Sequence, residues 1–143
     1  MKALLTLALF GIGAFAAPVP KEVRKQSPRD QLQGDWVIVS LDEGSGQQVQ
    51  TGVFEDFTLV IDGDKISTST KGGQGWKNVT VVHDFSAKPM RMDVHDGLSV
   101  FAGIFKFEDG RLHWCKSQPG QPVPTEFQGS KGTYCFIWKR AEK

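Results

Sequence analysis

The most constraining feature of this sequence is a Gly-x-Trp motif near its beginning that is matched by a basic residue near its end. Gly34 and Trp36 open an apolar stretch that is typical of a first strand, and Arg140 closes the last such stretch. In a small closed β-barrel, an indole can seal one end while a cation from the final strand stacks on its face. The two ends of the chain therefore predict a barrel in which Gly34, Trp36 and Arg140 form the closed end.

Short apolar stretches separated by turn residues run between these two motifs. Apolar and polar residues alternate with the period of two that strands require, and no long stretch has the 3.6-residue period of an amphipathic helix. Asp-Gly pairs, as at Asp62-Gly63 and Asp109-Gly110, predict tight hairpins. We expect eight strands, at 34–41, 57–62, 65–70, 76–83, 90–95, 100–107, 112–116 and 133–139, with a short helical turn at 52–56.

This pattern places the chain in the all-β class. Sequential antiparallel strands can close into an up-and-down barrel, and closure removes the exposed edges of an open sheet. An immunoglobulin-like sandwich is the competing all-β fold, but it normally places a Trp between two Cys residues spaced across the domain. Cys115 and Cys135 both lie in the last two expected strands, and no Trp lies between them. We therefore expect a single eight-stranded up-and-down antiparallel barrel.

Motifs along the chain, taken in their order, resemble the lipocalin or calycin superfamily. They are more closely similar to a small secreted domain of unknown function that is abundant in planctomycete bacteria. The matching pieces span 30–140 and comprise Leu32-Gln33-Gly34-Asp35-Trp36, Val39-Ser40, Gly63-Asp64-Lys65, Lys88-Pro89, Met92-Asp93, Gly103-Ile104-Phe105, Leu112, Cys115, Pro124-Thr125-Glu126-Phe127 and Lys139-Arg140. The chain departs from the pattern at Val123, where an Arg is usual, and at Cys135. The resemblance implies a lipocalin-like barrel and transfers no established chemistry.

The first residues have the features of a signal peptide. Lys2 precedes an apolar run over 3–15, and Ala14-Phe15-Ala16 has the small-x-small pattern that signal peptidase reads. A membrane anchor is the alternative, but the run is shorter than the roughly 20 residues that a spanning helix needs. We expect a signal peptide at 1–16, a linker at 17–30 and the barrel at 31–141. This organisation predicts a secreted or periplasmic protein with no membrane anchor after cleavage.

The balance of charge argues against nucleic acid as a partner. The chain has 17 Lys and Arg residues against 16 Asp and Glu residues, and cleavage would remove Lys2. Nucleic-acid binding needs Lys and Arg clustered on one face. The basic stretch at 21–25 contains Glu22 and lies beside prolines, which is typical of a solvated linker.

The two cysteines of an exported chain raise the question of a disulfide. If the last two strands are neighbours, Cys115 and Cys135 can lie opposite each other. A bridge would close a loop of about 20 residues and stabilise the fold by about 3 kcal/mol through loop-closure entropy. The alternative is a pair of buried apolar thiols. Neither Cys belongs to a recognisable Cys/His catalytic motif.

We expect no enzyme, metal site or cofactor. The acidic and histidine residues that could hold a metal are His83, Asp84, Asp93, His95, Asp96 and His113. We interpret them as solvated turn residues in preference to a set of metal ligands. The sequence has no nucleophile elbow, no Walker loop and no dinucleotide-binding glycine motif. No nucleophile, base and orienting group can be named in one place.

Apolar residues in the middle of the chain are candidates for a ligand pocket. The candidates are Trp76, Met90, Met92, Phe101 and Phe105, although the same residues could simply fill the core. The orientation of Trp76 distinguishes a ligand-binding barrel from an interaction module, since an inward ring would line a cavity and an outward ring would support an interaction surface. We expect a barrel that binds a small apolar or amphipathic molecule. The alternative is a ligand-free structural or protein-interaction module outside the cytoplasm, whose protein partner the sequence does not identify.

Overall fold

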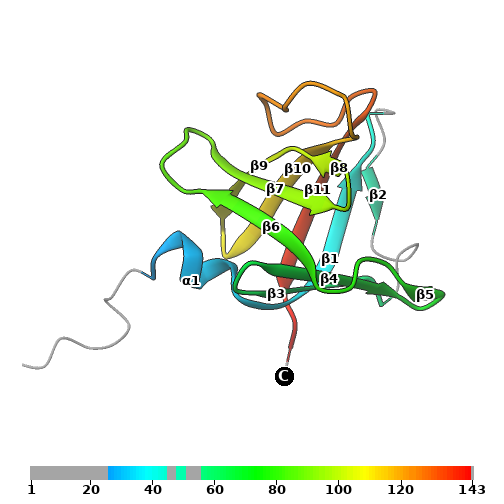
Figure 1. The fold of residues 1–143 in the computed structure, drawn as a ribbon. Helices are drawn as coiled ribbons and strands as arrows, with labels where there is room; N and C mark the ends of the chain where they lie inside the picture. Colours follow the sequence, from blue (N-terminus) through cyan, green and yellow to red (C-terminus); the bar gives the residue numbers. More distant parts are fainter. Residues whose placement is uncertain (1–25, 45–47, 51–55, 143) are drawn as a thin grey trace, which may run out of the picture.

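The computed structural model of the chain describes residues 26–44, 48–50 and 56–142. In these ranges it contains one short helix and eleven strands joined in one sheet (Figure 1). The elements are α1 (Pro28–Leu32), β1 (Gly34–Asp42), β2 (Gln48–Gln50), β3 (Thr58–Asp62), β4 (Lys65–Thr70), β5 (Gly73–Gln74), β6 (Val79–Asp84), β7 (Met90–Asp96), β8 (Ser99–Phe101), β9 (Gly103–Glu108), β10 (Arg111–Ser117) and β11 (Thr133–Arg140). The expected signal peptide, most of the expected linker and most of the expected turn at 52–56 lie outside the described residues. No helix in the described ranges is long and apolar enough to cross a bilayer.

Eight of the described strands close into an antiparallel barrel. Their order is β11-β10-β9-β7-β6-β4-β3-β1, and β1 pairs again with β11 to complete the ring. Across this seam Trp36 lies opposite Arg140, and the register shifts at an irregularity between Ile38 and Ser40. The predicted eight-stranded all-β barrel is therefore confirmed, and it is compatible with a lipocalin-like fold.

The three short strands β2, β5 and β8 extend the pairing of barrel strands at one end. We call the end that carries Trp36 and Arg140 the closed end and the opposite end the mouth. Three barrel strands pair with a barrel neighbour toward the closed end and with a short strand toward the mouth: β1 with β3 and then β2, β4 with β6 and then β5, and β7 with β9 and then β8. The three strand pairs β1 and β3, β4 and β6, and β7 and β9 therefore lose their mutual pairing toward the mouth.

Two strands differ from the expected ranges because of side-chain hydrogen bonds to the backbone. β6 begins only at Val79, since the Trp76 amide donates to the Thr68 hydroxyl instead of joining the ladder. The expected strand at 100–107 is divided between β8 and β9. There the amide of Gly103 donates to the Asp93 carboxylate, at 3.1 Å, which interrupts the strand.

The barrel interior is packed with large apolar side chains. Its fully buried members include Leu32, Trp36, Leu59, Ile61, Ile66, Met92, Val94, Phe105, Leu112, Trp114 and Trp138. A second, smaller cluster lies apart from this core and contains Ile104, Cys115 and Cys135, with Phe127 packed against it. The alternation of the strands thus gives the barrel wall an apolar inner face and one apolar patch on its outer face.

Candidate functional site

Gly34, Trp36 and Arg140 lie together at the closed end. The Arg140 guanidinium carbon is 4.0 Å from the centre of the Trp36 ring, and the guanidinium donates to two backbone carbonyls in the segment 31–33. Trp36 Nε1 donates to the carbonyl of Leu32 at 2.9 Å. Gly34 has a φ of +111°, and a Cβ there would lie 3.0 Å from the guanidinium. These contacts seal the barrel, so this end has a structural role.

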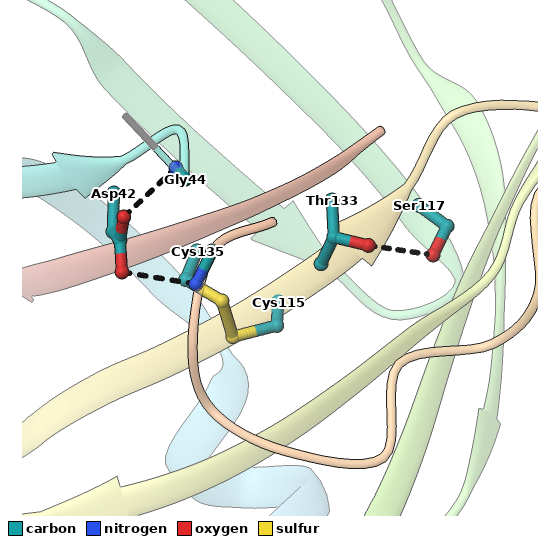
Figure 2. Close-up of a disulfide and its surroundings, with 7 residues drawn as sticks. Asp42, Gly44, Cys115, Ser117, Thr133 and Cys135 are labelled. Atoms are coloured by element: carbon teal, nitrogen blue, oxygen red, sulfur yellow. Dashed lines mark hydrogen bonds between the residues drawn. A yellow bond between two sulfur atoms is a disulfide. The ribbon is translucent and has the colours of Figure 1, made fainter. Parts of the chain in front are cut away.

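Cys115 and Cys135 lie opposite each other on β10 and β11 and form a disulfide (Figure 2). The bridge belongs to the outer cluster, where Phe127 from the β10–β11 connection packs against it. Asp42 at the end of β1 accepts a hydrogen bond from the Gly129 amide at 2.9 Å, which ties the same connection to the barrel. The disulfide is thus part of a structural assembly on the outer face.

The alternation of β10 places a lysine on the inner face. Leu112 and Trp114 belong to the interior core, while Cys115, which follows Trp114, belongs to the outer cluster. Lys116 follows Cys115 and returns to the inner face, near the mouth, where it is only partly exposed. An ammonium at such a position is costly unless its surroundings compensate for lost water.

Four aromatic rings surround the ammonium of Lys116. Its Nζ lies 4.0 Å from the ring centre of Trp76, 5.2 Å from that of Phe101, 5.4 Å from that of Phe136 and 5.5 Å from that of Trp114. All four distances are in the range of cation–π contacts. Among the described residues Nζ has no carboxylate partner and no hydrogen bond. We call these five residues the lysine cage.

Burial makes the Lys116 ammonium group more acidic than that of an ordinary lysine. Desolvation lowers its pKa from 10.5 to about 8, because an apolar environment disfavours the charged form. The faces of the rings act in the opposite direction and favour the ammonium. At neutral pH Lys116 is therefore mainly cationic, but more of it is neutral amine than in an exposed lysine.

Trp76 is held in the cage by β4. Its amide donates to Thr68 Oγ1 and its carbonyl accepts from the Thr68 amide, each at 2.9 Å. Its ring meets Phe101 edge to face, with 5.2 Å between ring centres, and lies 6.4 Å from the ring of Trp114. Trp76 therefore faces the interior, which is the orientation that a ligand-lining role requires.

The other ligand-lining candidates are distributed differently. Phe101 belongs to the cage, whereas Met92 and Phe105 are completely buried in the packed core. Met90 is partly buried and pairs with Phe105 on the neighbouring strand. These three methionine and phenylalanine positions fill the barrel away from the cage, so the structure unites only two of the five candidates.

Sequence reasoning missed Lys116, Trp114 and Phe136 as members of the site. A signal for the lysine was present, because the alternation Leu112, Trp114, Lys116 assigns all three to one face. A lysine at the end of a strand is more often a solvated residue, since its long stem can carry the ammonium to water.

Two hollows on the described surface lie away from the cage. One of about 580 Å³ is formed within the β10–β11 connection by residues of the segment 121–133. Another of about 320 Å³ lies at the closed end beside Trp36 and Arg140. Neither is lined by Lys116 or Trp76, and the Lys116 side chain itself occupies the space between the rings. Within the described ranges no group of three or more His, Cys, Asp or Glu residues could hold a metal ion.

No family model, curated protein or solved structure matches this chain. Small barrels host many unrelated functions, because function depends on the side chains of a site and not on the fold. The lysine cage combines a partly exposed position, a shifted pKa and four aromatic surfaces. It is therefore the feature on which a functional hypothesis can rest.

Proposed function

We propose that this protein binds a small amphipathic molecule with an acidic head group at the mouth of its barrel. The observation that carries the proposal is the position of Lys116 Nζ, 4.0 Å from the centre of Trp76 and surrounded by three further rings. The ammonium supplies a charge-assisted hydrogen bond, and the rings supply apolar contact area. In this role the barrel acts as a carrier and not as an enzyme.

The charge of the cage selects the class of ligand. A carboxylate or similar anion would give the Lys116 ammonium the ionic partner that the described residues do not provide. A cationic ligand is disfavoured, since Lys116 already lies over the rings and would repel it. A wholly apolar ligand would leave the ammonium further desolvated without a partner. An acidic amphipathic molecule satisfies both the charge and the rings.

Ligand entry requires the Lys116 side chain to move. Its four-carbon stem is flexible, and its position near the mouth leaves it partly exposed. The apolar body of the ligand would replace the ammonium over the ring of Trp76. Nζ would then follow the acidic head group toward the mouth.

The first test is binding of a defined aromatic acid. Titrating the mature domain with 2-naphthoate, followed by calorimetry and by the emission of Trp76 and Trp114, should give saturable binding. The variant K116M should lower the affinity about tenfold or more, which corresponds to the loss of one charge-assisted contact. Lys106 provides a matched control, because its Nζ also lies over a ring, 4.6 Å from the centre of Phe127 on the outer face. K106M should therefore bind like the unchanged protein.

Two results would contradict the proposal. One is equal affinity of K116M and the unchanged protein for 2-naphthoate, and the other is no binding by either. Native mass spectrometry of the protein from its own exported fraction, with a denaturing run to release bound molecules, would identify a natural ligand. A released amphipathic acid is the expected result.

A second candidate function is that of a protein-interaction module. The turn between β7 and β8 carries Leu98, which is fully exposed, and Val100 beside it is 40% exposed. Exposed apolar residues on one hairpin are typical of a contact surface. This candidate predicts that L98S removes a protein partner and leaves 2-naphthoate binding unchanged.

We also propose that the protein is a secreted or periplasmic lipocalin-like domain of the kind that its motifs resemble. The Cys115–Cys135 disulfide supports this location, because disulfides persist in oxidising compartments. The mass of the mature protein should correspond to cleavage after Ala16. A protein that keeps Met1 and accumulates in the cytosol would contradict export.

A further inference from the structure

We infer that Lys116 is a nucleophile for aldehydes, and that the lysine cage holds a small apolar or aromatic aldehyde as an imine on Nζ. The inference, which rests on the proposed function in using the same mouth site, names a second class of ligand for it. Its basis is geometric. Nζ lies within 5.5 Å of four ring centres, and no carboxylate among the described residues holds it in an ion pair.

The rings favour both approach and product. The rings of Trp76 and Phe101 meet edge to face, and Nζ lies 4.0 Å and 5.2 Å from their centres. An apolar aldehyde bonded to Nζ would therefore contact these rings. Imines are hydrolysed by water, so a site with apolar walls shifts the equilibrium toward the imine. A protonated imine keeps the positive charge and with it the attraction to the rings.

The acidity of Lys116 adds to this arrangement. Attack requires a neutral amine, and burial lowers the pKa of Lys116 to about 8. At pH 7 such a lysine is about 10% neutral, whereas an exposed lysine is roughly 0.04% neutral. Desolvation in an apolar pocket is a recognised way to activate a lysine for imine formation.

The reaction needs no redox partner. The nitrogen lone pair of Lys116 attacks the carbonyl carbon, a C–N bond forms, and the carbonyl π electrons move to oxygen. The nitrogen loses a proton and the oxygen gains one, which gives a carbinolamine. Loss of the hydroxyl group with a second nitrogen proton, as water, forms the C=N bond. One aldehyde and one amine thus give one imine and one water.

Lys106 is the comparison that isolates the cage. It also contacts a ring, that of Phe127, but its ammonium is paired with Glu108 at 3.0 Å and lies on the outer face. Proximity to one aromatic ring is therefore common to both lysines. Of the two lysines, Lys116 alone is surrounded by four rings and has no carboxylate partner among the described residues.

The inference is tested by trapping the imine. The mature protein at pH 7.4 is incubated with less than one equivalent of 2-naphthaldehyde, reduced with cyanoborohydride and analysed by intact mass and peptide mapping. We expect a naphthylmethyl group on Lys116, formed about tenfold faster than on any exposed lysine; the larger neutral fraction is offset in part by the lower nucleophilicity of a less basic amine. K116R, which keeps the charge and cannot form the imine, should lose this product, while K106R should retain it.

Labelling spread over exposed lysines with no excess at Lys116 would overturn the inference, and the peptide map shows this without any variant. The matched acid, 2-naphthoate, separates the two proposals. Binding of the acid without labelling of Lys116 would refute the imine and leave the proposed function standing. Labelling of Lys116 without binding of the acid would support the imine and refute the preference for an acidic head group. Neither result would refute both.

Discussion

Arg140 and Trp36 are direct partners across the seam that closes the barrel, and the guanidinium carbon lies 4.0 Å from the centre of the indole ring. One pair of residues therefore joins the last strand to the first and also seals the end of the barrel. The guanidinium adds hydrogen bonds to the backbone that precedes β1. Strand pairing and the closing of the end are thus coupled in a single contact.

Removing the guanidinium should weaken the whole barrel. R140M loses the contact with Trp36 and two hydrogen bonds to backbone carbonyls, at an exposed position. We expect the free energy of unfolding to fall by about 1–2 kcal/mol in urea titrations. K139M removes the same charge from the neighbouring exposed residue and should change stability by less than about 0.5 kcal/mol. Equal effects of the two variants would contradict the role assigned to Arg140.

A methyl group at Gly103 should be poorly tolerated. A Cβ there would lie 2.6 Å from Trp114 Nε1 and 2.8 Å from the Met92 carbonyl oxygen, and the strand backbone cannot move aside easily. G103A should therefore destabilise the protein by about 1–3 kcal/mol through overpacking. At Gly72 the nearest atom to an added Cβ is 4.0 Å away, so G72A is the control and should be nearly neutral. A stable G103A would mean that β9 can move away from β7 and β10 without cost.

The disulfide should contribute strongly to stability. Cys115 and Cys135 are 20 residues apart, and a loop of this length is expected to add about 3 kcal/mol. In urea titrations the double variant C115S/C135S should therefore show a free energy of unfolding that is lower by about 3 kcal/mol, and reduction of the unchanged protein should have a similar effect. The same stability with and without reducing agent would contradict this prediction, because it would mean that the disulfide does not reduce the conformational entropy of the unfolded chain enough to change stability.

Thr68 is expected to position Trp76. T68V removes the hydroxyl that accepts the Trp76 amide, so Trp76 loses one of its two hydrogen bonds to Thr68. We expect weaker binding of 2-naphthoate, by about threefold to tenfold, with a loss of stability of about 1 kcal/mol. T70V removes a longer hydrogen bond, 3.3 Å, from an exposed Thr on the same strand and should leave binding unchanged. A blue shift or red shift of tryptophan emission in T68V alone would report the displaced ring.

Lys116 should give the stability of the protein a characteristic dependence on pH. Its pKa is lowered to about 8 in the folded state from 10.5, so between these values the unfolded chain binds the proton more readily. Stability contributed by this group is therefore lowest below about pH 8 and rises as the pH increases toward 10.5.

K116M lacks this titration and isolates it. The difference in unfolding free energy between the unchanged protein and K116M should move in favour of the unchanged protein as the pH is raised from 7 to 10, while K106M should follow the unchanged protein. Parallel pH profiles for the unchanged protein and K116M would contradict the assignment. No free cysteine is present among the described residues, so thiol exchange does not complicate alkaline measurements of that part of the chain.

Most of the strand framework follows from local sequence. Asp-Gly turns and strict alternation of apolar residues placed β3, β4, β7, β10 and β11 close to their observed ranges. The division of β8 from β9 could not be read locally, because it depends on Asp93 accepting the amide of Gly103 from ten residues away. Local pattern thus predicts where strands run, and distant side-chain hydrogen bonds decide where they stop.

The lysine cage could be predicted only in part. Alternation along β10 assigns Lys116 to the inner face, and Phe101 and Trp76 are recognisable as large apolar residues. Their convergence is not local, since Trp76 reaches the cage through its hydrogen bonds to Thr68, and Phe101 does so through the pairing of β8 with β7. A single sequence therefore identifies several residues of the site but does not show that they lie together in the fold.

The seam between β1 and β11 also has a consequence for the order of events in biosynthesis. Residues at the two ends of the barrel domain, such as Val37 and Lys139, must meet before the ring of strands is complete. A chain emerging from its amino end exposes one edge of β1 until β11 has been made. Such sequence-distant pairing is slow to form, on the order of milliseconds to seconds. Closure of the barrel must therefore follow the synthesis of β11, and until then the edge of β1 that will pair with β11 stays open to other contacts.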